Sequence, residues 1–141
     1  MSFYLDASAI LAILVEESSS RAVDDFLSAA DETLIVGDFA AAEVASGLSR
    51  RARTGSLDLA AANAGLAQFD AWRAAFTLDL DLHTGDVRLA HVFVRRFDLG
   101  LRAPDALHTA ICRRGGHKLV TLDRRLATAA EALGVRAIHP G

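Results

Sequence analysis

Four acidic residues spread along the chain have the placement of a cation site. Three follow predicted strands or open predicted helices and the fourth lies inside a long predicted helix: Asp6, Asp105, Asp123 and Glu43. Ligands of open α/β sheets bind beyond the carboxyl ends of the strands, where this placement would gather the carboxylates. Two like charges about 4 Å apart repel by roughly 4 kcal/mol even at an effective dielectric near 20. Such a cluster therefore predicts a hard divalent cation, which carboxylate oxygens coordinate.

Taken one at a time, these acids have ordinary structural explanations. An aspartate at a helix start accepts hydrogen bonds from free backbone N–H groups and complements the helix dipole, which would account for Asp6, Asp105 or Asp123. Glu43 stands in mid-helix among alanines, where capping does not apply, so its plain alternative is a solvated helix face. Capping and metal binding are compatible, so both interpretations stay open at this point.

Neighbouring side chains also allow a site role and a structural role. Ser8 and Thr121 each stand two residues from one of the aspartates, so their hydroxyls either orient carboxylates or serve ordinary turns and caps. His108 follows Asp105 by about one helical turn, and we expect a packing histidine there.

Arginine supplies nearly all of the positive charge. The net charge is −3, Lys118 is the only lysine, and the arginine groups are Arg50, Arg51 and Arg53; Arg95 and Arg96; Arg113 and Arg114; Arg124 and Arg125. The planar guanidinium suits phosphate, although a basic residue at a helix end also complements the dipole. The acidic balance lacks the basic excess that often marks nucleic-acid binders, so phosphate contacts would have to come from these local groups.

The elements that must position these residues alternate between strand and helix. The patterns predict strands at 3–5, 34–36, 76–82, 118–122 and 135–138, and helices at 6–15, 20–30, 37–53, 57–72, 84–97, 103–115 and 123–133. We therefore expect an α/β fold with a mostly parallel central sheet of about five short strands, flanked by helices. The alternation at 76–82 indicates an edge strand, and the helices on either side of Thr54-Gly55-Ser56 form a projecting helical hairpin.

Length and composition predict a single globular domain spanning residues 1–141. Hydrophobic residues make up 52% of the chain, enough to bury a core. The longest apolar run, Ala7 to Val15, is well short of the roughly 20 residues that a membrane span needs, so we expect no membrane association. One cysteine, Cys112, makes no internal disulfide, which agrees with a cytoplasmic location.

Four motifs, taken together, resemble those of a known family. They are Tyr4-Leu5-Asp6-Ala7-Ser8-Ala9, Ala42-Glu43-Val44, Pro104-Asp105-Ala106-Leu107-His108 and Val120-Thr121-Leu122-Asp123. In this order and spacing they resemble a PIN domain, and the whole chain is similar to VapC-type ribonuclease toxins of type II toxin–antitoxin systems. The resemblance implies a PIN-like fold and a Mg²⁺- or Mn²⁺-dependent endoribonuclease whose acids are Asp6, Glu43, Asp105 and Asp123. It also implies an RNA substrate, a homodimer and a small cognate antitoxin.

The working hypothesis for the site makes Asp6 and Asp105 the main metal ligands, with Asp123 and Glu43 completing the site directly or through water. A phosphotransfer protein with Asp6 as nucleophile or phosphoacceptor is the first alternative, although neither a second nearby aspartate nor a lysine stands where that chemistry needs it. A non-catalytic interaction module, with the acids as caps and the alanine-rich hairpin binding a partner, is the second.

Overall fold

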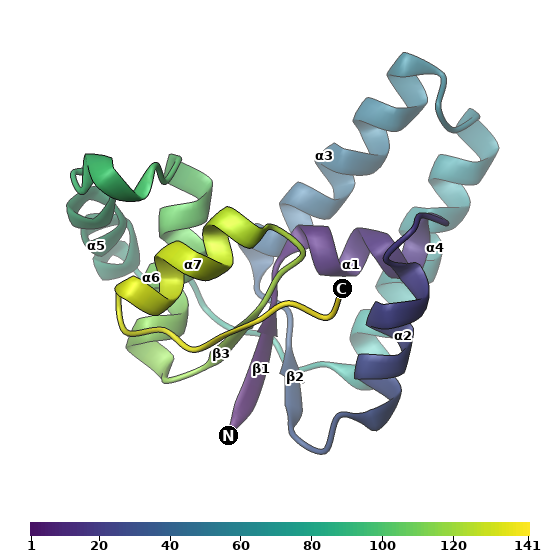
Figure 1. Ribbon diagram of the computed structural model, residues 1–141. Helices are drawn as coiled ribbons and strands as arrows, with labels where there is room; N and C mark the ends of the chain where they lie inside the picture. The colour runs from purple at the N-terminus through teal and green to yellow at the C-terminus, as the bar shows by residue number, and fades with distance from the viewer.

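A parallel sheet of four strands forms the centre of the molecule (Figure 1). In the computed structural model, which describes residues 1–141, the strands are β1 (Ser2–Leu5), β2 (Thr33–Ile35), β3 (Lys118–Val120) and β4 (Ala137–Ile138). Their spatial order is β2-β1-β3-β4, and every neighbouring pair is parallel. Parallel neighbours need crossover connections, which helices supply here. The predicted α/β class is confirmed, with four strands in place of about five.

Seven α-helices connect and cover the strands. They are α1 (Ala7–Leu14), α2 (Ser20–Ala29), α3 (Asp38–Thr54), α4 (Leu59–Phe76), α5 (Thr84–Val94), α6 (Ala103–Gly115) and α7 (Arg124–Ala132), with a 3-10 helix at Phe97–Leu99. Asp6, Asp58 and Asp123 cap α1, α4 and α7 by accepting backbone N–H bonds. α3 ends on Gly55, whose φ of 82° favours a residue without a Cβ. None of the helices combines the length and apolar composition that crossing a membrane requires.

The sheet separates two apolar layers, because successive side chains of a strand point to opposite faces. Phe3 and Leu5 of β1 face one core, which α1, α3 and α4 cover. Tyr4 of β1 and Leu119 of β3 face the other, which α6 and α7 cover. Cys112 is buried in this second core. Both faces of the sheet are therefore covered, and its carboxyl edge is left for a site.

Helices α3 and α4 form a hairpin that projects beyond the sheet (Figure 1). Leu48 of α3 is buried against Gly65 of α4, where a Cβ would lie 3.3 Å from the leucine side chain. At the base of the hairpin, Arg73 of α4 donates to the carbonyl oxygen of Val36 and pairs with Asp38, each at 3.1 Å. The predicted hairpin is confirmed, and its base is fixed to the end of β2.

The predicted edge strand at 76–82 is wrong. Helix α4 continues through Phe76, since the alanines before it favour helix, and Leu78 alone reaches β2, in a parallel bridge to Ile35. Phe76 and Leu78 are 67% and 61% exposed, so their alternation does not mark a buried face. Arg114 of α6 donates to the carbonyl oxygen of Asp81 at 3.0 Å. This side-chain hydrogen bond helps to hold a segment that has no continuous backbone pairing with a strand.

Candidate active site

Asp6 lies directly beyond β1, buried at the carboxyl edge of the sheet, with 5% of its surface exposed. Its Oδ1 accepts hydrogen bonds from the Ala9 backbone N–H at 3.1 Å and from the Ser8 hydroxyl at 2.6 Å. Its Oδ2 accepts from the Thr121 hydroxyl at 2.5 Å. Asp6 therefore acts as the predicted helix cap, and the two hydroxyls orient its carboxylate.

The electrostatics of Asp6 are those of a carboxyl group held away from water. Burial raises the pKa of Asp6 above its ordinary value, while the hydrogen bonds from Ser8 and Thr121 act in the opposite direction. Desolvation of this kind disfavours the charged form. A nearby cation would reverse the effect, because it stabilises the carboxylate by direct attraction.

Thr121 connects Asp6 to the end of β3. Besides donating to Asp6, its hydroxyl oxygen accepts from the Asp123 backbone N–H at 3.1 Å. The Ser8 hydroxyl similarly accepts from the Leu122 backbone N–H at 3.0 Å. The chain segments that carry Asp6 and Asp123 are thus held together through hydroxyls, while Asp123 caps α7 through Oδ1.

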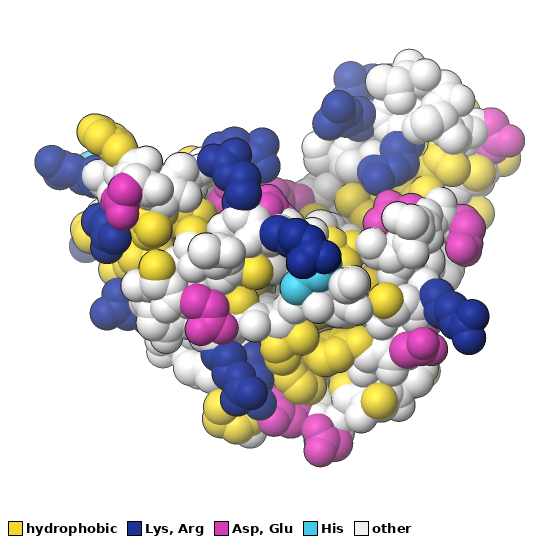
Figure 2. All heavy atoms as spheres, viewed as in Figure 1, with side chains coloured by type: hydrophobic (Ala, Val, Ile, Leu, Met, Phe, Trp, Pro, Cys, Tyr) yellow, Lys and Arg dark blue, Asp and Glu magenta, His cyan; other side chains and the backbone are white.

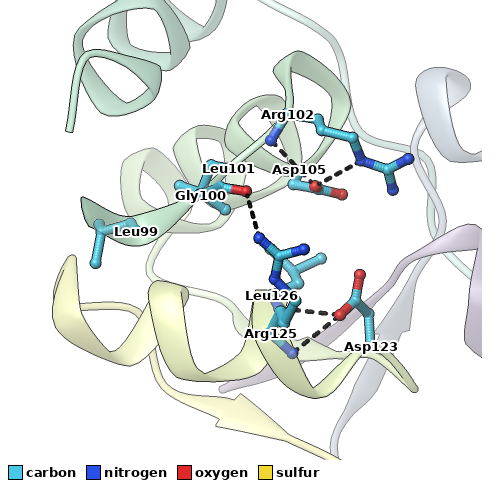
Figure 3. Close-up of a pocket in the computed structure, with 8 residues that line it drawn as sticks. All are labelled: Leu99, Gly100, Leu101, Arg102, Asp105, Asp123, Arg125 and Leu126. Atoms are coloured by element: carbon cyan, nitrogen blue, oxygen red, sulfur yellow. Dashed lines mark hydrogen bonds and ion pairs between the residues drawn. The ribbon is translucent and has the colours of Figure 1, made fainter. Parts of the chain in front are cut away.

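Asp105 and Asp123 line one pocket of about 320 Å³. Its lining residues are Leu99, Gly100, Leu101, Arg102, Asp105, Asp123, Arg125 and Leu126. Figure 3 shows Asp105 on α6 and Asp123 at the start of α7, on different sides of this pocket. The Asp105 carboxylate accepts from the Arg102 backbone N–H at 3.3 Å and from its guanidinium at 3.4 Å, while Arg125 reaches the carbonyl oxygen of Gly100 at 3.3 Å.

Glu43 approaches from the other side, on α3. Its side chain is 31% exposed, and its Oε1 accepts a hydrogen bond from Nε2 of His108. His108 is buried and bonds through Nδ1 to the hydroxyl of Tyr4. The expected packing histidine is therefore present, but one of its two partners is the acid for which the sequence offers no capping role.

The structure brings the four acids to one edge of the sheet without closing them into a cluster. Asp105 and Asp123 share a pocket, Asp6 is joined to the Asp123 segment through Thr121, and Glu43 is joined to α6 through His108. No three Asp, Glu, His or Cys side chains lie close enough together to hold a metal ion.

The donor set nevertheless suits a hard cation. Its members are carboxylates, the ligand type that Mg²⁺ and Mn²⁺ prefer, and burial disfavours ionisation of Asp6 in the absence of a positive partner. Arg102 supplies such a partner to Asp105, at 80% side-chain exposure. Because the guanidinium side of this pair is exposed to solvent, the pair contributes little to stability.

Arg102 and Tyr4 contact acids or the histidine of the site, but sequence reasoning assigned neither of them a role there. Arg102 stands outside the arginine groups. Its position three residues before Asp105 is the spacing of a helical ion pair, and that spacing is the signal that could have found it. Tyr4 is part of a buried strand, and its pairing with His108 follows only from the packing of α6 on the sheet.

Basic side chains flank the carboxylates. Figure 2 shows Lys and Arg side chains on the hairpin tip and on the α6–α7 side, with a hollow between them where acidic side chains are visible. Exposed arginines include Arg50 and Arg53 near the end of α3 and Arg124 and Arg125 at the start of α7. The net charge of −3 therefore hides local groups that can bind anions beside a site that can bind a cation.

The sequence and the fold of the chain are similar to those of known proteins. The PIN domain family model matches residues 3–132. Ribonuclease VapC3 of Pyrobaculum aerophilum is 36% identical over 133 residues, which cover 94% of this chain and 98% of that protein. The fold is similar to that of Mycobacterium tuberculosis VapC20, a sarcin-ricin loop cleaving toxin, with a TM-score of 0.73 and 14% identity over 90% of this chain and 94% of that one. It is also similar to VapBC2 of Rickettsia felis, bound to a promoter DNA fragment, with a TM-score of 0.71, 10% identity and coverage of 99% and 98%.

Proposed function

This chain belongs to the PIN domain family, and from that premise we propose that it is a metal-dependent endoribonuclease, the toxin of a type II toxin–antitoxin system. The observation that carries the proposal is the convergence of Asp6, Glu43, Asp105 and Asp123 at the carboxyl edge of the sheet, beside exposed arginines. The similarity to Ribonuclease VapC3 over nearly the whole of both chains supports the ribonuclease activity.

In this proposal Asp6 and Asp105 hold Mg²⁺ or Mn²⁺, and Asp123 and Glu43 complete the site directly or through water. A bound cation supplies two effects at an RNA phosphodiester, a lower pKa for the attacking water and compensation of the charge that builds on the phosphoryl oxygens. Ser8 and Thr121 keep both oxygens of Asp6 in fixed directions. Glu43, exposed on one side, accepts a proton from the water that attacks.

The arginines of the pocket provide the phosphate contacts that carboxylates cannot. Arg102 and Arg125 line the pocket together with Asp105 and Asp123, and both are exposed. With a cation held by Asp6 and Asp105, the Arg102 guanidinium would be available to donate to a phosphate oxygen instead of to Asp105. The RNA backbone would then lie in this pocket, beside the residues proposed to hold the cation.

A small cognate antitoxin and a second copy of the chain are the protein partners in this proposal. Several proteins of similar fold are toxin–antitoxin complexes, among them VapBC-1 of nontypeable Haemophilus influenzae, with a TM-score of 0.71. We expect the toxin to act on RNA in the cytoplasm as a homodimer and to be inhibited when the antitoxin is bound.

Both alternatives have less support than the nuclease. A phosphotransfer site around Asp6 would need a nearby lysine, but Lys118 begins β3, at the other end of the strand, and pairs with Glu32 at 2.8 Å. In an interaction module the acids serve as caps, but Glu43 caps nothing and bonds to a buried histidine.

Mapping RNA ends after induced expression tests the proposal and identifies the substrate. Cells expressing the chain should accumulate new 5′ ends at defined positions, and cells expressing Asp6→Asn at the same level should not. Asparagine keeps the shape of the side chain and its cap to Ala9 but removes the charge. Identical end profiles for the two strains would reject the nuclease.

A further inference from the structure

His108 of α6 links this helix, which carries Asp105, to α3, which carries Glu43. Phe39 and Glu43 are one turn apart on α3, and both contact His108 of α6: the Phe39 ring lies 5.2 Å from the imidazole between centroids, and Glu43 Oε1 bonds to Nε2. On the opposite side, the Tyr4 hydroxyl bonds to Nδ1 at 2.6 Å. The imidazole is buried, with 3% of its surface exposed. Its position is therefore fixed by contacts from β1 and α3.

The partners of His108 determine where its ring proton lies. A carboxylate accepts hydrogen bonds but does not donate them, so Nε2 must carry the proton that is shared with Glu43. Tyr4 Oη has His108 as its hydrogen-bond partner, and burial raises the pKa of Tyr4, so the phenol keeps its proton. The phenol donates to Nδ1, because otherwise its own proton would remain unpaired in the core. The chain of donors thus runs from Tyr4 through His108 to Glu43.

This arrangement leaves one oxygen of the Glu43 carboxylate without a hydrogen bond to the protein. Oε1 is occupied by His108, while Oε2 makes no hydrogen bond to the protein and the side chain is 31% exposed. His108 also lies three residues after Asp105 on α6. One helix therefore carries Asp105 and the imidazole that fixes the direction of Glu43, which comes from α3.

We propose that His108 is a positioning residue for Glu43, and that Tyr4 holds its imidazole in the tautomer that donates from Nε2. This inference rests on the proposed nuclease function, because the purpose of the positioning is to aim Glu43 Oε2 at the attacking water. Partners of this type typically change activity or metal affinity by about 10-fold to 100-fold when they are removed.

Nitrogen NMR of the metal-free protein tests the tautomer without any activity. With histidines labelled at both ring nitrogens, the His108 signals should show a protonated Nε2 and an unprotonated, hydrogen-bonded Nδ1. Tyr4→Phe should move the Nδ1 signal toward that of a free ring nitrogen, because it removes the donor. A ring protonated at Nδ1 only would overturn the inference, since Nε2 could not then donate to Glu43.

A pair of amide substitutions tests the positioning. His108→Gln places an amide N–H near the position of Nε2 and keeps a donor to Glu43, whereas His108→Asn places it near Nδ1 and does not. We expect His108→Gln to keep kcat within about threefold of the unmodified chain and His108→Asn to lose about 10-fold to 100-fold in kcat, with KM little changed, on a random-sequence RNA pool in Mn²⁺.

Controls separate this inference from the nuclease proposal. His91→Gln and His91→Asn, on the exposed face of α5, should leave kcat unchanged. Equal activity of His108→Gln and His108→Asn would overturn the positioning role while the nuclease stands. Equal losses in both, with melting temperatures lowered alike, would assign His108 a purely structural role and also overturn it. An unmodified chain that cuts no RNA would reject the nuclease and, with it, the positioning role.

Discussion

At the scale of single residues, Asp6 combines two roles that its sequence position left open. It caps α1 and is also a buried carboxyl group with hydroxyl donors on both of its oxygens. A cap alone does not need burial, since Asp58 caps α4 in the same way at the surface. Because capping does not explain the burial of Asp6, we infer that its carboxyl group has a second role.

Asp6 should make the stability of the metal-free protein depend on pH. Burial raises its pKa above the ordinary 3.8, so the folded state retains a proton that the unfolded state has already lost. The free energy of unfolding should therefore fall as pH rises from the unfolded pKa through the raised folded pKa. Urea unfolding in EDTA, from about pH 4 to about pH 8, should show this fall in the unmodified chain relative to Asp6→Asn. A difference between the two proteins that does not vary with pH would contradict a buried, ionisable Asp6.

Arg102 and Arg125 should contact RNA phosphate. In a Glu43→Gln background with Mn²⁺, which removes the proposed proton acceptor but keeps Asp6 and Asp105 for the cation, replacing either arginine by glutamine should reduce the slope of log affinity against log salt by about 1. Arg21→Gln, on the exposed face of α2, is the matched control and should leave the slope unchanged. Slopes that stay equal in all three variants would exclude these arginines as phosphate contacts.

The sequence indicates the acids but not all of their partners. Asp6, Asp105 and Asp123 could be predicted because strand ends and helix starts are local signals, and Ser8 and Thr121 because they stand two residues away. The bond between Glu43 and His108 joins α3 to α6 across the fold, and no local pattern specifies it. The assignment of these four acids as the catalytic and metal-binding residues stays a prediction until mutants are measured.

At the scale of elements, the helical hairpin depends on the contact between α3 and α4. Leu48→Ala should lower the free energy of unfolding by about 2–5 kcal/mol, because it removes a fully buried side chain and leaves a cavity beside Gly65. Leu59→Ala, at the start of α4 with 71% exposure, is the matched control and should change it by about 0.5 kcal/mol or less. Urea midpoints measure both, and equal values would show that α3 and α4 are not held by this packing.

The one element predicted wrongly shows what periodicity cannot decide. Residues 76–82 alternate as a strand does, but most of this segment has no neighbour with which to pair, and α4 extends into its first residue. Alternating apolar and polar residues show that a segment could have one buried and one exposed face. A strand also needs a neighbouring strand within hydrogen-bond distance, and the alternation does not show whether one is present. Strands β1 (Ser2–Leu5) and β3 (Lys118–Val120) were predictable because their buried apolar residues, Phe3 to Leu5 and Leu119-Val120, fit a parallel sheet covered on both faces.

At the scale of the whole molecule, a bound cation should stabilise the fold. A ligand that binds only the folded state adds about 2.7 kcal/mol at a hundred times its dissociation constant. For a domain of this size that corresponds to a rise in melting temperature of roughly 5–10 °C. Thermal melts should show this rise with Mn²⁺ in the unmodified chain and a much smaller one in Asp6→Asn. The same shift in both proteins would place the cation away from Asp6.

The order of the strands in the sheet brings the proposed site residues together at its carboxyl edge. Strands β1 and β3 are neighbours in the sheet, which brings Asp6 and Thr121 within hydrogen-bond distance although they are far apart in the sequence. The packing of α6 and α7 on the same face of the sheet then sets Asp105 and Asp123 around one pocket.

Cleavage of RNA by the purified chain tests the central claim most directly. A mixed RNA should be cut in Mn²⁺, remain intact in EDTA and be cut again when Mn²⁺ is restored, while Asp6→Asn should leave it intact throughout. Cleavage that continues in EDTA, or that Asp6→Asn retains in full, would contradict a metal-dependent nuclease built on these four acids.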